Sequence, residues 1–337
     1  MTASDRYRSP SRFTDPRSKA ALLTALPDDV DGICEVAKRQ TIHHNLRPYF
    51  GIPSSEWKAM ARVWPPRLES ILAAIETVDP HNLEDPRPPR QRVVGACMLE
   101  SHFLAGLLRY RGIPIRVRAG YFRNIRAKRD HVVDFWERTS REKGVMADLL
   151  RKDPAAWRRR NRAYTRKQNE IDHHIEHWIC EYWDPRQRKW RLLDANNTFL
   201  KAHSDIETGF RLSPRYFERA AEAWRRMRRT PDFNPDQYFE EPQDGRSHIR
   251  SQLLWDFFSL LNHDIAGFDA SSNRAMQFIK KRTYAKTPAS ELRELDRLAL
   301  LMSRSPSVDE LADFYRESPT LGVVGAEKDP YCFVSDR

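Results

Sequence analysis

The stretch RVVGACMLESHFLAGLLRYRGIPIRVRAGYF, residues 92–122, decides the fold of this 337-residue chain. From Cys97 to Arg109 its apolar residues repeat at helical spacing, which predicts an amphipathic helix that begins at the cysteine. Gly112 can adopt the left-handed conformation that commonly ends a helix. From Ile113 to Tyr121 apolar and polar residues alternate, which predicts a half-buried strand directly after the helix.

Two further stretches, HWICEYWD at 177–184 and KWRLLDAN at 189–196, predict a β-hairpin around an Asp-Pro turn. A hairpin centred near residues 186–187 would place residue 177 opposite residue 194 or 195. His177 and Asp194 would then be cross-strand neighbours. We expect the carboxylate to hold the Nδ1–H of the imidazole, so that Nε2 faces a nucleophile.

Cys97 is the candidate nucleophile. It follows two small residues at the start of the predicted helix, where the helix dipole favours a thiolate and main-chain N–H groups can face a developing oxyanion. Taken alone, a cysteine at this position is more often an inert core residue. Cys180 is a weaker candidate, because it lies three residues from His177 and points to the other face of the strand.

Together these stretches resemble the core of the transglutaminase-like superfamily, which has a papain-like fold and a Cys-His-Asp triad. That family has a GxC motif opening a helix, an LLRxxGIPxRxxxGY passage, a His-Trp strand with a glutamate four residues after the histidine, and a W-x-x-x-D strand. The resemblance implies that Cys97 is the nucleophile, His177 the general base and acid, and Asp194 the residue that orients the imidazole.

The similarity extends to bacterial transglutaminase-like proteins of unassigned substrate, through an LP-D-V lead-in at 26–30 and an FxxAxxAWR motif at 217–225. Two features depart from the family. The segment between Phe122 and Asp172 is longer than such proteins usually have, and Met98 stands where relatives often carry a polar side chain. The substrates of such relatives are therefore a weaker guide to the substrate of this chain.

The sequence predicts an α+β fold with a papain-like core: a Cys-bearing helix packs on an antiparallel sheet, with helical additions before and after. We expect a flexible arm at 1–18, followed by a helical region and proline-rich connector at 19–90. A catalytic core at 91–205 would contain a basic insertion at 123–170, and a helical region would span 206–337.

Positive charge is concentrated in one part of the chain. The 58 Lys and Arg residues exceed the 47 Asp and Glu residues by 11, and residues 116–168, with 17 basic and 6 acidic residues, carry the same excess. Such a block is often only a solvated helical insertion. It could also recruit an anionic partner, such as a carrier protein, coenzyme A or tRNA, although no nucleic-acid-binding motif accompanies it.

Composition excludes several classes of protein. With 40% hydrophobic and 31% charged residues the chain is typical of soluble globular proteins, and it has no run of about 18 apolar residues for a membrane span. The four cysteines at 34, 97, 180 and 332 match neither a disulfide framework nor a zinc ribbon. The first 18 residues show no secretory signal, so we expect a cytoplasmic protein without membrane contact; its oligomeric state is not indicated.

A working triad would transfer an acyl group through a thioester on Cys97. An amine acceptor would give an amide, and the cytoplasmic setting favours such a biosynthetic role. With water as acceptor the same triad would be a peptidase, amidase or deamidase. We expect no cofactor, since the calcium dependence of some family members has no recognisable loop here.

Two other interpretations stay open. The run from His173 to His177 matches the H-x-x-E-H signature of inverted zinc peptidases, which requires a helix, whereas the following Trp178–Trp183 run is typical of a strand. A zinc site would also leave Cys97 unexplained. Alternatively, the domain has lost catalysis and serves as a binding scaffold.

Overall fold

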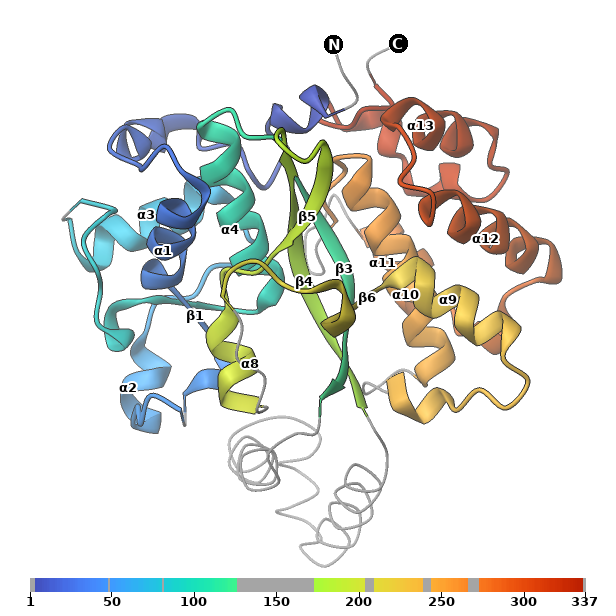
Figure 1. Ribbon diagram of the computed structural model, residues 1–337, viewed down its shortest axis with the longest axis horizontal. Helices are drawn as coiled ribbons and strands as arrows, with labels where there is room; N and C mark the ends of the chain where they lie inside the picture. The colour runs from blue at the N-terminus through green and yellow to red at the C-terminus, as the bar shows by residue number, and fades with distance from the viewer. Residues whose placement is uncertain are drawn as a thin grey trace, which may run out of the picture.

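The structure, a computed structural model of the chain, has an α+β fold in which helices lie on both sides of an antiparallel sheet (Figure 1). Beyond residue 125, the basic insertion expected at 123–170 lies outside the described residues. The ranges that the structure describes are 4–47, 49–80, 82–125, 173–203, 209–238, 244–265 and 273–335.

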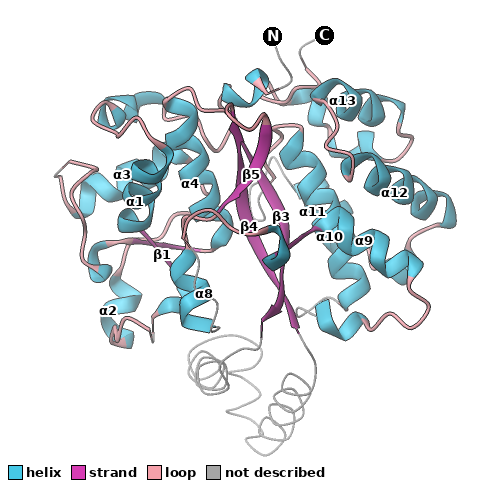
Figure 2. Cartoon of the chain, in the orientation of Figure 1, coloured by secondary structure: helices cyan, strands magenta, loops and turns pink. Residues whose placement is uncertain are grey.

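The central sheet has four antiparallel strands in the order β5-β4-β3-β6 (Figure 2). Its strands are β3 (Ile115–Ile125), β4 (His173–Asp184), β5 (Lys189–Leu193) and β6 (Phe217–Arg219). A separate parallel pair, β1 (Thr41–His43) and β2 (Val93–Gly95), brings the chain to the start of the cysteine-bearing helix.

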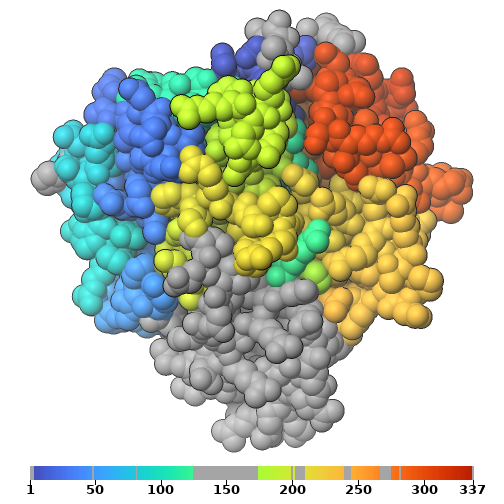
Figure 3. All heavy atoms as spheres, in the orientation of Figure 1, coloured from blue at the N-terminus to red at the C-terminus, as the bar shows by residue number. Residues whose placement is uncertain are grey.

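The helices before the sheet and the helices from residue 220 onward lie in two groups, separated at the surface by β4, β5 and the chain that follows them (Figure 3). The helix at 197–203 lies on the side of the first group (Figure 1). The first group contains α1 (Val30–Gln40), α2 (Ser54–Ala59), α3 (Leu68–Val78) and α4 (Cys97–Tyr110). Later in the chain come α8 (Asn197–His203), α9 (Ala220–Arg229), α10 (Gly245–Leu260), α11 (Asn273–Met276), α12 (Ala289–Met302) and α13 (Val308–Glu317). Among the described residues, none of these helices has the length and apolar character needed to span a membrane.

The helix α4 begins at Cys97, as its periodicity predicts, and packs against β4. The Ser101 hydroxyl donates to the main-chain oxygen of Trp178 over 2.8 Å, and the Cys180 thiol donates to the main-chain oxygen of Ser101 over 3.2 Å. Beyond the helix, Gly112 has φ +69°, the left-handed conformation expected where the chain turns into β3. The helix-to-strand passage is therefore confirmed.

The hairpin of β4 and β5 forms around residues 185–188, but its register differs slightly from the expectation. Asp184 pairs with Lys189 and Cys180 with Leu193, so the residue opposite Asp194 is 179 rather than 177. His177 and Asp194 are therefore diagonal neighbours on one face, two residues apart in register, a separation that long side chains still bridge.

The first 18 residues are not a flexible arm in the structure, which describes them from Ser4 onward. Tyr7 and Phe13 are buried, at 2% and 0% exposure, and the Tyr7 hydroxyl donates to the main-chain oxygen of Leu260 over 2.9 Å. Tyr7 also packs edge-on against Phe333, so the two ends of the chain lie side by side (Figure 1). The polar composition of this segment predicted a flexible arm, but burial of its two aromatic rings holds the segment against the rest of the protein.

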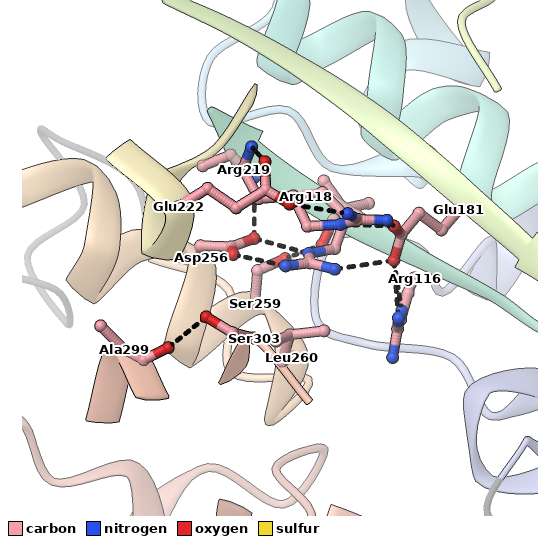
Figure 4. Close-up of polar contacts among 12 residues, drawn as sticks. Arg116, Arg118, Glu181, Arg219, Glu222, Asp256, Ser259, Leu260, Ala299 and Ser303 are labelled. Atoms are coloured by element: carbon pink, nitrogen blue, oxygen red, sulfur yellow. Dashed lines mark hydrogen bonds and ion pairs between the residues drawn. The ribbon is translucent and has the colours of Figure 1, made fainter. Parts of the chain in front are cut away.

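A buried ion network holds β4 against β3 and α10 (Figure 4). Arg118 donates to Asp256 over 2.8 and 2.7 Å and to Glu181 over 2.7 Å. Arg116 and Arg219 also donate to Glu181. Burial alone would raise the pKa of Glu181, but the three guanidinium groups hold it well below its usual range. Arg116 and Arg118 were counted in the basic block at 116–168, and they are neutralised inside the protein instead.

Candidate active site

His177 and Asp194 form a buried pair at the edge of the sheet where β5 has ended. The Nε2 of His177 lies 3.2 Å from Oδ2 of Asp194, and the two residues are 1% and 5% exposed. The ring of Phe122 on β3 stacks on the imidazole at 4.1 Å between centroids, and the main-chain N–H of Asn196 donates to Oδ1 of Asp194 over 2.8 Å. Phe122 therefore fixes the orientation of the imidazole, and the N–H of Asn196 fixes that of the carboxylate.

The carboxylate meets the opposite ring nitrogen from the one expected. We predicted a bond from Nδ1 of His177 to Asp194, whereas Nε2 lies next to the carboxylate. Asp194 follows the last residue of β5 and lies two residues before the position opposite His177, so it meets the imidazole diagonally. When Nε2 carries the proton and donates it to Asp194, Nδ1 is the basic nitrogen.

Cys97 is the first residue of α4 and is 9% exposed. Its side chain is part of the main hydrophobic core of the protein. The preceding residue, Ala96, has no side chain that could cap the helix, in contrast to the serine or aspartate usual at that position. The start of α4 therefore keeps the positive end of its dipole at the cysteine.

Glu100, one helical turn after Cys97, was missed by the sequence analysis. It is 6% exposed and accepts a hydrogen bond from the side-chain amide of Asn196 over 2.5 Å. This bond joins the first turn of α4 to the segment that directly follows Asp194. Burial, and then the negative charge of Asp194, raise the pKa of Glu100 well above its usual range. The only signal in the sequence was an acidic residue in an otherwise apolar helical turn.

Two of the other cysteines are poor nucleophiles in the structure. Burial, reinforced by the charge of Asp194, raises the pKa of the Cys180 thiol, and burial likewise raises that of Cys34 well above its usual value. Because the thiolate is the reactive form, both side chains stay unreactive. The prediction that Cys180 points away from His177 agrees with its bond to Ser101 on α4.

The zinc-peptidase interpretation is not supported by the secondary structure. Residues 173–177 lie in the strand β4 rather than in a helix. Residues four apart are separated by about 13 Å along a strand, compared with about 6 Å along a helix, so the strand lacks the spacing that the signature requires. Within the described ranges no group of three His, Cys, Asp or Glu residues could hold a metal.

Comparisons with known proteins add no relative: no family model matches the chain, and neither the curated proteins nor the solved structures contain a match.

Proposed function

We propose that the protein is a papain-like cysteine acyltransferase that forms amide bonds through a thioester on Cys97. The observation that carries the proposal is the buried His177–Asp194 pair, whose carboxylate lies two residues before Asn196, a residue bonded to the first turn of α4, the helix that begins at Cys97. The polar bond between Glu100 and Asn196 ties that helix start to the segment carrying Asp194.

In the proposed reaction the Cys97 thiolate attacks the carbonyl carbon of an acyl donor and forms a carbon–sulfur bond. The main-chain N–H groups at the start of α4 stabilise the oxyanion. His177 passes a proton to the leaving group as its bond to carbon breaks. The acceptor amine then gives a proton to His177 and attacks the thioester, and the sulfur departs as thiolate. Asp194 stabilises the imidazolium in both steps.

Burial of the site favours an amine over water as acceptor. With Cys97 9% exposed and His177 1% exposed, little solvent reaches the sulfur, and exclusion of water protects a thioester from hydrolysis. Hydrolysis by the same triad is the second candidate reaction. We also propose a cytoplasmic role with an anionic partner at 123–170, which rests on the charge of that segment.

The test is intact-mass spectrometry of the protein with activated amide, ester and thioester donors, followed by an amine chase. We expect an acyl adduct on Cys97 that the amine removes faster than water does. The Cys97→Ala variant should form no adduct, whereas Cys34→Ala should react as the wild type does.

An adduct on Cys34→Ala and Cys97→Ala alike would refute the assignment of the nucleophile. Release by water at the same rate with or without amine would favour the hydrolase. Absence of any adduct in the wild type, together with a cellular phenotype that Cys97→Ala complements fully, would favour the scaffold.

A further inference from the structure

Two adjacent histidines lie next to the start of α4. The strands β1 and β2 run in parallel with His43 opposite Gly95, and Gly95 stands two residues before Cys97. The next residue, His44, has its Nδ1 3.2 Å from the main-chain oxygen of Gly95. The two imidazole rings stack at 4.5 Å between centroids. Both side chains are therefore tied to the strand that leads into the cysteine-bearing helix.

The face of β1 that carries His43 is turned toward α4. Ile42 and Val94 belong to a separate apolar cluster on one face of the two strands. Because side chains alternate along a strand, His43 and its partner Gly95 point to the other face. A Cβ at Gly95 would lie 2.7 Å from Leu99 in the first turn of α4, which identifies that face. The imidazole of His43, 4% exposed, is thus buried on the side where α4 begins.

The same histidines lie beside the segment that follows Asp194. The strand β1 contacts α4 (Figure 1). The single helical turn His44–Leu46 contacts α8, which begins three residues after Asp194. The two histidines are therefore placed where the segment that begins at Cys97 meets the segment that follows Asp194.

A main-chain hydrogen bond fixes the position of the proton on His43. The N–H of Asn45 donates to Nδ1 of His43 over 3.2 Å, so Nδ1 accepts and carries no hydrogen. The hydrogen of the ring is then on Nε2, and the ring is neutral. For His44 the reverse holds at Nδ1, which faces a carbonyl oxygen and donates to it. His43 therefore has an uncharged N–H donor at Nε2.

We propose that the Nε2–H of His43 is the side-chain donor of the oxyanion hole, beside the main-chain N–H of Cys97. The inference rests on the proposed acyl transfer and adds a second donor to it. When the sulfur bonds to the carbonyl carbon, the carbonyl oxygen takes the electron pair of the C=O π bond and accepts a hydrogen bond from each donor. No proton leaves His43, and both hydrogen bonds weaken when the leaving group departs and the carbonyl re-forms.

A buried, neutral and fixed donor suits this task. A hydrogen bond to a developing charge is stronger where water is excluded, and a neutral imidazole is an established way to polarise a carbonyl group. The stack with His44 and the bond from Asn45 hold the ring, so it need not reorganise as the charge develops.

The test compares two reactions of Cys97 that differ in whether an oxyanion forms. Attack on p-nitrophenyl acetate passes through an oxyanion, whereas displacement of iodide from iodoacetamide occurs at a tetrahedral carbon and forms none. His43→Phe keeps a planar ring and removes the donor. We expect its rate of acylation at Cys97 to fall about 10²- to 10³-fold, while its rate of alkylation stays close to that of the wild type.

Two further variants separate donation from packing. His43→Leu should repeat the result without an aromatic ring, and His43→Gln, which supplies a neutral side-chain N–H, should recover most of the acylation rate. The matched control is His263→Leu, which removes another buried imidazole, one that is bonded to Asp329. It should leave the ratio of acylation to alkylation unchanged.

The possible failures are distinguishable. If the wild type is acylated and the ratio is unchanged in His43→Phe and His43→Leu, the role of His43 is overturned and the proposed function stands. An equal fall in both rates, without recovery in His43→Gln, would also overturn it, because His43 would then only support the structure. If Cys97 of the wild type is alkylated but never acylated, the proposed function fails and the oxyanion hole fails with it.

Discussion

Two polar clusters on β4, one around Glu181 and one around His177, differ in how their buried charges are compensated. Around Glu181 every buried charge meets a charge of the other sign, supplied by Arg116, Arg118 and Arg219. Around His177 the balance is incomplete: Glu100 lies near Asp194, and burial together with the charge of that carboxylate raises the pKa of Glu100. Compensated charges are typical of a cluster that stabilises a fold, whereas perturbed, incompletely compensated groups are typical of functional sites.

The largest expected effect comes from Asp194→Asn, which removes the charge and keeps the shape. Both hydrogen bonds of the side chain can persist, but the imidazolium loses its counter-charge and its tautomer. We expect the rate of acyl transfer to fall about 10³- to 10⁴-fold, as in other triads, with a change in unfolding free energy below about 1 kcal/mol. Enzyme assays and urea denaturation measure the two quantities.

Asp28→Asn, which alters an almost fully exposed carboxylate, is the matched control and should leave both quantities unchanged. A loss of several kcal/mol of stability in Asp194→Asn with the rate retained would reverse the assignment of the two clusters.

The opposite outcome is expected for Arg118→Met in the Glu181 network. This change leaves Glu181 and Asp256 buried with fewer partners, so the free energy of unfolding should fall by about 3–5 kcal/mol. Chemical denaturation measures it, with Arg186→Met in the exposed hairpin turn as the control. A loss below about 1 kcal/mol would show that the network contributes little to the fold.

A third cluster, around Glu218, has partly compensated charges. Burial raises the pKa of Glu218 to about 7, although Arg226 and the Tyr238 hydroxyl both donate to its carboxylate. Because the folded-state pKa exceeds the unfolded value of 4.5, the protonated form is favoured in the folded protein. Its stabilising contribution is complete below about pH 4.5 and is lost as the pH rises through about 7.

The difference of about 2.5 units corresponds to about 3 kcal/mol. Unfolding of the wild type and Glu218→Gln, compared at pH 5 and pH 8, should show that the wild type loses more stability by an amount of this order. Parallel pH profiles for the two proteins would mean that Glu218 titrates normally.

The smallest effect is expected for an exposed ion pair. Arg211 and Asp31 lie 2.5 Å apart with side chains 42% and 53% exposed. A double-mutant cycle with Arg211→Met and Asp31→Asn should give a coupling energy of about 0.2–1 kcal/mol, which decreases with added salt. A coupling energy above about 2 kcal/mol would show that this exposed ion pair stabilises the fold as much as a buried pair does.

The parts of the fold that the sequence predicts are those set by local patterns. Helical spacing after Cys97, the left-handed Gly112 and the hairpin around residues 185–188 each depend on residues close in sequence. The pairing of His177 with Asp194 followed from hairpin arithmetic, and an error of two residues in register still left both side chains on one face.

What the sequence could not predict depends on contacts between distant segments. The bond between Glu100 and Asn196 joins residues 96 positions apart, and the bond from Tyr7 to Leu260 joins residues 253 positions apart. No periodicity encodes such contacts, because they arise only when the helices pack on the sheet. The burial of Arg118 was missed for the same reason, since its partner Asp256 lies on α10.

The central claim is that the imidazole of His177 activates the sulfur of Cys97, and the most direct test is the rate at which iodoacetamide alkylates Cys97 in the wild type and in His177→Ala. General-base assistance predicts a fall of about 10²- to 10⁴-fold at neutral pH, with Cys97 still the residue modified. Equal rates in the two proteins, with the fold of His177→Ala intact, would contradict the claim.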